Sequence, residues 1–263
     1  MNSKLPALAL LLCAAFSLNG CATVSEAMHV SKTPEAEWST CVRSIPEGKE
    51  TAIAPYPRTQ DYPWMSKNEW CGRVKKVLNE PNRFEAKIGF MGDSISQGWP
   101  QEYLTKRFGL LKPVKMGIGG DKTQNLLWRI DNGELKGMVL DNLVLQIGTN
   151  NLGAGDSPEE VAQGIKRVID RIHTGQPNAH IVVMGIFPRG KERSDPLRTK
   201  IQETNRIVSD SAKQWNIGYM DIGSQLMEKD GSISQEIMVD YLHLTAKGYQ
   251  IWADTLANYI AKK

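Results

Sequence analysis

A serine and a histidine with a nearby carboxylate are the residues of this sequence that could together carry out nucleophilic catalysis. Ser94 ends the triplet Gly92-Asp93-Ser94, which directly follows a short apolar run. A serine hydroxyl becomes an effective nucleophile when a neighbouring base removes its proton. Among the four histidines, His243 stands three residues after Asp240, and a carboxylate at this spacing can hold an imidazole in one tautomer. These residues are candidates for a nucleophile, its base and the group that orients the base.

Small polar residues after two further apolar runs could supply the hydrogen-bond donors that this chemistry needs. Residues 117–121, three of them glycines, follow the second run, and residues 148–151, which end in two asparagines, follow the third. A glycine lets a substrate approach a bare backbone amide, and an asparagine offers a side-chain N–H. Ordinary turns favour the same residue types, so one such cluster indicates little, whereas three in register favour a functional site.

The elements that must position these clusters are five short apolar runs that alternate with helical patterns. The runs cover residues 86–91, 113–118, 143–147, 180–186 and 217–222. Ser157, Pro158 and Glu160 form a capping box with proline at the first helical position, and a last amphipathic helix is expected to begin near Thr245. This alternation predicts a doubly wound α/β fold with a parallel sheet, in which reactive groups gather at the carboxyl ends of the strands.

Composition limits the class of protein. The 263 residues are 41% hydrophobic and 23% charged, which is typical of a globular chain. The formal net charge is only +3, and no basic block stands out, so we expect no nucleic-acid partner.

The first twenty residues are typical of an export signal. A short n-region with one lysine precedes an apolar stretch over residues 5–16, which is too short to span a bilayer as a helix. Residues 18–21, Leu-Asn-Gly-Cys, resemble a bacterial lipobox, which implies cleavage before Cys21 and lipidation of that cysteine. A plain secretory signal with a chance cysteine is the alternative.

The lipobox interpretation predicts a protein anchored by lipid in the bacterial cell envelope. We expect the outer membrane, facing the periplasm or the cell surface, because Ala22 rather than an aspartate follows Cys21. Residues 1–20 are then the signal peptide, residues 21–60 a proline-rich tether or extension, and residues 61–263 the catalytic domain.

The remaining cysteines suggest a disulfide. Cys13 leaves with the signal, Cys21 carries the lipid, and Cys41 and Cys71 remain as one pair. Outside the cytoplasm we expect these two to be bonded, with two buried free thiols as the alternative. A metal site is disfavoured because no histidine accompanies them.

The ordered clusters resemble those of the SGNH hydrolases, also called GDSL esterases. Within that superfamily they are most similar to the catalytic subunits of the intracellular platelet-activating factor acetylhydrolases. The similar stretches are residues 64–66, 92–94, 117–121, 127–129, 132–135, 148–151, 188–190 and 240–245. The resemblance covers the chain from about residue 60 onward.

The resemblance implies a three-layer α/β/α, flavodoxin-like fold with a five-stranded parallel sheet. Ser94 would be the nucleophile, His243 the general base and Asp240 its orienting partner. The backbone amides of Ser94 and Gly120 and the side-chain amide of Asn150 would form the oxyanion hole. No metal or cofactor would be needed.

Two positions depart from the family pattern. Ile95 replaces the leucine of the GDSL name, and Asn151 replaces the aspartate common after the third-block asparagine. The first change is a conservative apolar one and the second matches the acetylhydrolase branch, so neither threatens the expected chemistry.

The expected function is hydrolysis of short-chain carboxylic esters, O-acetyl groups above all, on a glycan or a small molecule. The first alternative is a lysophospholipase or thioesterase that acts on longer acyl chains, and the second is a glycan-binding lipoprotein without activity. No Gly-x-Ser-x-Gly elbow, dinucleotide fingerprint or HExxH motif supports another enzyme class. No feature of the sequence predicts an oligomeric state.

Overall fold

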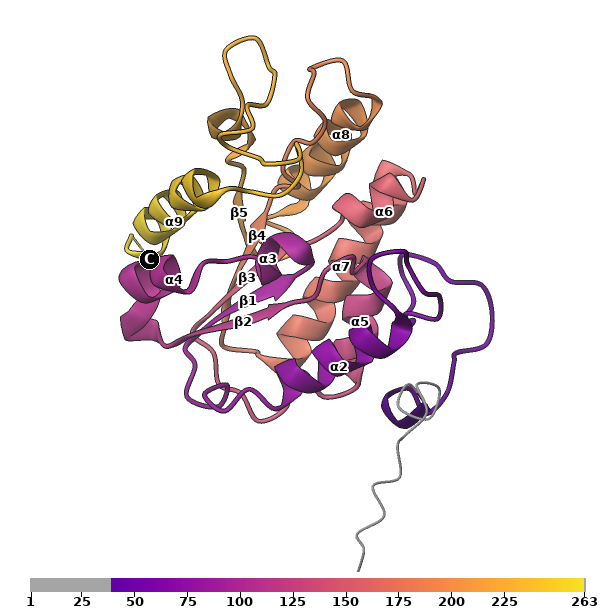
Figure 1. Cartoon of the computed structure of the whole chain (residues 1–263). Coiled ribbons are helices and arrows are strands. Elements are labelled where there is room, and N and C mark those ends of the chain that lie inside the picture. The colour runs from indigo at the N-terminus through magenta and orange to yellow at the C-terminus, as the bar shows by residue number, and fades with distance from the viewer. Residues whose placement is uncertain (1–38, 263) are drawn as a thin grey trace, which may run out of the picture. The chain divides into compact units, whose positions relative to one another are not determined.

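The five apolar runs form the strands of one parallel sheet in the computed structural model, which describes residues 39–262 (Figure 1). The strands are β1 (Ile88–Gly92), β2 (Pro113–Gly117), β3 (Asn142–Gln146), β4 (His180–Met184) and β5 (Gly218–Met220). Their order across the sheet is β2-β1-β3-β4-β5. The predicted α/β fold is confirmed, and each strand lies within its predicted run or differs from it by one residue at an end.

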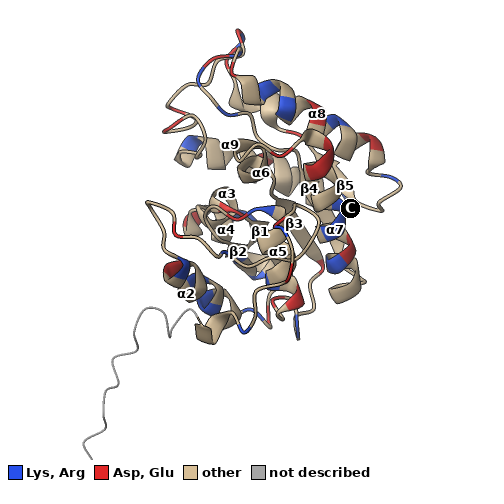
Figure 2. Ribbon diagram, turned by 90° about the vertical axis from the view of Figure 1, so that its right-hand side faces the viewer, with Lys and Arg blue, Asp and Glu red and all other residues tan. Residues whose placement is uncertain are grey.

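The helices of the described chain connect the strands and cover both faces of the sheet. They are α2 (Lys67–Leu78), α3 (Ser94–Gln97), α4 (Gln101–Phe108), α5 (Thr123–Asp131), α6 (Thr149–Gly153), α7 (Pro158–Gly175), α8 (Pro196–Ser211) and α9 (Ala246–Ile260), with short 3-10 turns η1 (Gly109–Leu111) and η2 (Gly223–Leu226). Charged residues of both signs lie along α7 and α8 (Figure 2). No helix within residues 39–262 is both long and apolar enough to cross a membrane.

Side chains alternate along the strands and fill two separate cores. Met91 and Leu145 point to the face covered by α5 and α7, where Ile165 and Val168 pack against them. Phe90 and Val144 point to the opposite face, which α4 and α9 cover (Figure 1). There the rings of Trp99 and Trp252 lie 4.4 Å apart between centroids. Burial of apolar surface on both faces is what holds a parallel sheet together.

Local sequence fixes where helices α7 and α9 begin. Ser157 accepts from the backbone of Glu160, the Glu160 carboxylate accepts from Ser157 N–H, and Pro158 occupies the first helical position, as predicted. Thr245 caps α9 by accepting from the amide of Gly248, so this helix begins where the sequence places it.

The strand register brings the ends of three strands level with one another. Gly92 pairs with Gly117 of β2 on one side and with Gln146 of β3 on the other. The loops that follow β1, β2 and β3 therefore leave the sheet at the same edge. This edge carries all three polar clusters identified in the sequence.

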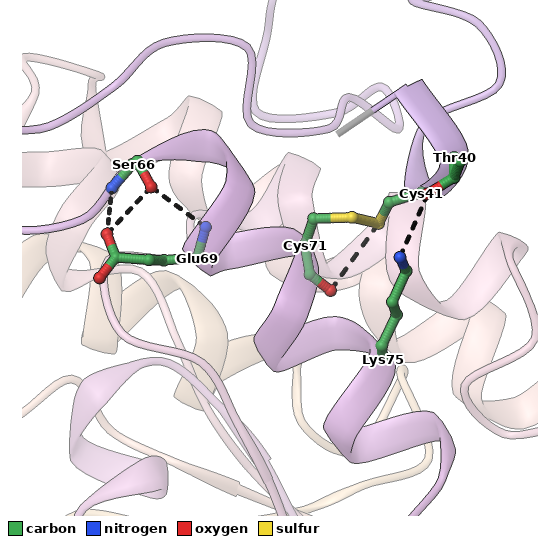
Figure 3. Close-up of a disulfide and its surroundings, with 6 residues drawn as sticks. All are labelled: Thr40, Cys41, Ser66, Glu69, Cys71 and Lys75. Atoms are coloured by element: carbon green, nitrogen blue, oxygen red, sulfur yellow. Dashed lines mark hydrogen bonds between the residues drawn. A yellow bond between two sulfur atoms is a disulfide. The ribbon is translucent and has the colours of Figure 1, made fainter. Parts of the chain in front are cut away.

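The chain before the sheet packs on the domain and is held there by a disulfide. Cys41 and Cys71 are bonded, with Cα atoms 5.8 Å apart, so the predicted pairing is confirmed (Figure 3). Cys71 lies on α2, which begins with a second capping box formed by Ser66 and Glu69 (Figure 3). The proposed signal peptide and Cys21 lie outside the described residues.

Further along, the same segment bonds directly to α5. Thr123 Oγ1 donates to the carbonyl of Ala52 at 2.8 Å, and the amide of Tyr56 donates to the carbonyl of Gln124 at 3.0 Å. Residues 52–58 thus run beside the loop that follows β2.

Reducing the Cys41–Cys71 disulfide should lower the free energy of unfolding by about 3–4 kcal/mol, because the bond closes a loop of some 30 residues in the unfolded chain. Urea unfolding with and without dithiothreitol measures this. The double variant Cys41→Ser/Cys71→Ser should match the reduced protein and ignore the reductant. Equal midpoints for the oxidised and reduced protein would contradict the prediction.

Candidate active site

Ser94 lies at a tight turn where β1 passes into α3. Asp93 caps this short helix, and its Oδ1 accepts from the amide of Ile95 at 2.9 Å. A Cβ atom on Gly92 would lie 1.9 Å from the carbonyl oxygen of Gln146, so only glycine fits between the strand ends here. The turn presents the Ser94 hydroxyl as the first side chain of α3.

His243 and Asp240 lie on a short loop. An isolated antiparallel bridge between Met238 and Leu244 closes the two ends of this loop. His243 Nε2 is 2.9 Å from Ser94 Oγ, across 149 residues of sequence. His243 Nδ1 is 2.7 Å from Asp240 Oδ2, and the backbone amide of His243 donates to Asp240 Oδ1 at 2.7 Å. The structure therefore brings together the three residues that the sequence nominated as nucleophile, base and orienting group.

The geometry sets the tautomer of the imidazole. A carboxylate is an acceptor, so Nδ1 carries the proton and Nε2 is left to accept from the Ser94 hydroxyl. Burial raises the pKa of Asp240, but the hydrogen bonds from the amide and imidazole of His243 outweigh it and lower that pKa below its usual range. Asp240 thus stays ionised at neutral pH.

The loop is strained next to these residues. Tyr241 has a φ of 63°, in the left-handed region that a bulky residue seldom adopts. Its carbonyl accepts from the amide of Gly190 at 2.9 Å, which fixes the turn against the loop after β4. Such conformations cost about 1–3 kcal/mol and persist where the surrounding structure enforces them.

The candidate oxyanion donors lie on the neighbouring loops. Gly120 has a φ of +74°, which favours glycine. Asn150 is the second residue of α6, and its Nδ2 donates to the carbonyl of Asp121 at 2.9 Å. A primary amide has two N–H groups, so one remains for a substrate. Asn150 and the loop after β2 are thus joined directly.

A buried ion network, which the sequence analysis did not assign, anchors that loop. The Asp121 carboxylate is fully buried and accepts from Trp70 Nε1 at 2.7 Å and from Arg129 at 2.5 Å. Arg129 also holds Glu134, with Nε at 2.6 Å from Oε2. Burial raises the pKa of Asp121, and the guanidinium of Arg129 opposes that rise.

The sequence contained a signal for part of this network. Arg129 follows three apolar residues inside a helix, and a cation at a core-facing position needs a buried anion. Nothing in the sequence indicated which carboxylates would meet it. Arg58 is the third side chain that faces the Asp121 carboxylate, with its NH2 group 3.6 Å from Oδ1. It belongs to none of the sequence motifs.

Asp93, next to Ser94, is a second buried carboxylate. It is fully buried, and this burial raises its pKa to about 7, with the nearby charge of Asp121 adding to the rise. One of its oxygens accepts from the amide of Ile95. Asp93 therefore serves as a helix cap that holds a proton below about pH 7.

The chain is also similar to known proteins. Residues 90–251 match the profile of the GDSL-like Lipase/Acylhydrolase family. The chain is 39% identical over 184 residues to the platelet-activating factor acetylhydrolase IB subunit alpha2 of Rattus norvegicus, which covers 69% of this chain and 79% of the relative.

Solved structures share the fold. A protein of Streptococcus pneumonia, provisionally described as a platelet activating factor, superimposes with a TM-score of 0.64 at 29% identity, over 73% of this chain and 92% of that one. A GDSL-like lipase of Bacteroides thetaiotaomicron has a TM-score of 0.60 at 19% identity, over 72% and 97%. The second likeness concerns the fold alone.

Replacing Asn150 by alanine should lower kcat about 10²- to 10³-fold, because the change removes one of the candidate donors to the developing negative charge. Steady-state ester hydrolysis measures this, and the melting temperature should change little because the Asn150 side chain makes a single hydrogen bond to the protein. Asn151 offers the contrast, since it is fully buried and bonds Thr123, Gln124 and Asp156. Asn151→Ala should chiefly lower stability. A folded Asn150→Ala protein with parental turnover would refute the assignment.

Replacing Asp93 by asparagine should stabilise the protein above pH 7. The folded state holds a proton on Asp93 up to a pKa of about 7, whereas the unfolded chain releases it near pH 4, so stability falls across this window as the pH rises. Asparagine keeps the cap and does not titrate. The variant should gain about 4 kcal/mol relative to the parent between pH 4 and pH 8, measured by urea unfolding. A difference that does not vary with pH would count against the raised pKa.

Proposed function

The chain belongs to the GDSL-like lipase/acylhydrolase family and is an ester-bond hydrolase, and on this basis we propose a serine esterase that removes short acyl groups, acetyl above all, through an acyl-enzyme on Ser94. The observation that carries the proposal is the continuous hydrogen-bond chain from Ser94 through His243 to Asp240, at 2.9 and 2.7 Å. These distances are those of a nucleophile, a base and an orienting carboxylate.

The proposed reaction has two halves. His243 Nε2 takes the proton of Ser94 as Oγ attacks the ester carbonyl, and Asp240 stabilises the imidazolium that results. Negative charge on the former carbonyl oxygen is held by the amides of Ser94 and Gly120 and by Asn150 Nδ2. Collapse returns the proton to the leaving alcohol and leaves Ser94 acylated. Water then attacks the acyl group with His243 as base, which releases the acid and restores the serine.

The relatives support the acetyl group as the acyl part. Those at 39% and 34% identity are named platelet-activating factor acetylhydrolase subunits alpha2 and alpha1. We propose an O-acetylated glycan or small molecule as the carrier of the ester in this protein.

The openness of the site supports a bulky carrier. The side chains of His243 and Asp240 keep 41% and 52% of their surface exposed, so an acyl group on a large molecule can reach Ser94 from the surface. Trp64, 58% exposed, lies beside Gly120, where its ring would be 2.5 Å from a Cβ at that glycine. It offers an apolar face next to the predicted oxyanion hole.

A second candidate is the hydrolysis of longer acyl chains from a lysophospholipid or a thioester. This candidate is supported by exposed apolar side chains beside the site. In addition to Trp64, Val239 next to Asp240 is 58% exposed. Two exposed apolar side chains near the catalytic loops could lie along an acyl chain.

We also propose that the protein is anchored by lipid on Cys21 in a bacterial cell envelope, from the lipobox-like residues 18–21. The Cys41–Cys71 disulfide supports a location outside the reducing cytoplasm, because disulfides persist in oxidising compartments.

Hydrolysis of p-nitrophenyl acetate, butyrate and octanoate by a protein that begins at Ala22 tests the proposed function. We expect kcat/KM for acetate to exceed that for octanoate about ten-fold or more, because a site that acts on short acyl groups, as proposed, would disfavour the extra methylenes. Ser94→Ala should abolish turnover.

Ser96→Ala is the matched control, because this buried hydroxyl two residues away donates to the carbonyl of Met91 at 3.2 Å and has no part in the relay. It should remain active. A preference for octanoate would favour the second candidate, and turnover of all three esters that survives Ser94→Ala would refute the proposed nucleophile.

A further inference from the structure

Arg58 is a buried cation that contacts the loop carrying the candidate oxyanion donor Gly120. It comes from the segment before α2, outside the residues that match the family profile. The residue is only 3% exposed, and its NH2 group donates to the carbonyl oxygen of Gly119 at 2.9 Å. Arg58 Cζ also lies 4.6 Å from the centre of the Tyr62 ring and 5.7 Å from that of Trp64.

Arg58 bonds the carbonyl of the peptide group whose N–H is the candidate oxyanion donor. The carbonyl of Gly119 and the N–H of Gly120 belong to one planar peptide group. A cation that donates to the oxygen of a peptide draws electron density from its nitrogen, so the N–H becomes a stronger donor. Arg58 and a substrate oxyanion would thus bind opposite ends of the same dipole.

The orientation of this peptide is fixed from both sides. The amide of Gly119 donates to Gln97 Oε1 at 2.7 Å, which sets the preceding peptide. A Cβ on Gly120 would lie 2.8 Å from the Arg58 guanidinium, so the cation packs directly against the glycine backbone. Arg58 NH1 contacts Met65 Sδ at 3.0 Å, which holds the guanidinium in place.

The positive charge of Arg58 acts on the neighbouring peptide with little screening by solvent, because the side chain is buried. Burial lowers the pKa of its guanidinium and Asp121, 3.6 Å away, opposes that shift, so the side chain remains a cation. Few water molecules can screen a group with this little exposure, and its field at the neighbouring peptide is correspondingly large.

We infer that Arg58 is a positioning residue that holds and polarises the Gly119–Gly120 peptide, so that the Gly120 amide is aimed at the oxyanion of the bound ester. The inference rests on the proposed function. The segment from Cys41 to Met65 then completes the active site, and the disulfide and the bonds to α5 secure the segment that delivers Arg58.

Three variants at this position separate charge from packing, with turnover of p-nitrophenyl acetate as one readout. Arg58→Met keeps the apolar stem, Arg58→Gln keeps a neutral donor, and Arg58→Lys keeps the charge. Methylboronic acid is the second readout, because it forms a tetrahedral anion on a reactive serine and so reports the oxyanion hole without turnover.

Arg83→Met is the matched control. Arg83 is 4% exposed and donates to the carbonyls of Leu78 and Glu134, not to the catalytic loops.

We expect Arg58→Met to lower kcat about 10- to 100-fold and to raise the dissociation constant of methylboronic acid by a similar factor, with KM within about two-fold of the parent. Arg58→Lys should recover most of both losses. Arg83→Met should lower the melting temperature while kcat and boronate binding stay at parental values.

Parental kcat and boronate binding in Arg58→Met would overturn the inference, as would equal losses in Arg83→Met. If Arg58→Met does not fold, the other two variants decide: Arg58→Lys must bind methylboronic acid more tightly than Arg58→Gln, and equal binding overturns the inference. Failure of the proposed function is distinguishable, because a parent that hydrolyses none of the esters can still bind the boronate through Ser94.

Discussion

The buried charge of Asp121 is the constraint on which the arrangement of the active site depends. A carboxylate without solvent must be matched by cations and donors, and here they come from three separate parts of the chain: Arg58, Trp70 and Arg129. Meeting that requirement fixes the loop after β2 against α2 and α5. The carbonyl of Asp121 in turn receives Asn150, so the same residue links the two loops that carry the candidate oxyanion donors.

The parallel sheet supplies the rest of the site by register. Strands β1, β2 and β3 end at residues that pair with one another, Gly92, Gly117 and Gln146. The loops that follow them, with Ser94, Gly120 and Asn150, therefore leave the sheet side by side. The candidate base, His243, comes from elsewhere, on a strained loop just before α9, and its Nε2 lies 2.9 Å from Ser94 Oγ. A catalytic arrangement assembled in this way needs rigid elements behind each loop.

The two carboxylates nearest the chemistry have opposite surroundings. Asp240 is half exposed and receives hydrogen bonds that lower its pKa, so it stays charged beside the imidazole. Asp93 is fully buried and binds a proton far more readily, and it caps the helix that presents Ser94. Solvent access and hydrogen bonding, rather than residue type, therefore decide which carboxylate can stabilise a positive histidine.

The sequence by itself determined the strands, the helix caps, the cysteine pair and the polar clusters around Ser94 and His243, because each depends on residue types a few positions apart. It did not predict that Arg58 bonds the carbonyl of Gly119, 61 residues away, or that Trp70 meets Asp121 across 51 residues. Nor did it predict the raised pKa of Asp93. Those features follow from long-range packing and from burial, which short sequence patterns do not encode. Only the tertiary structure could decide them.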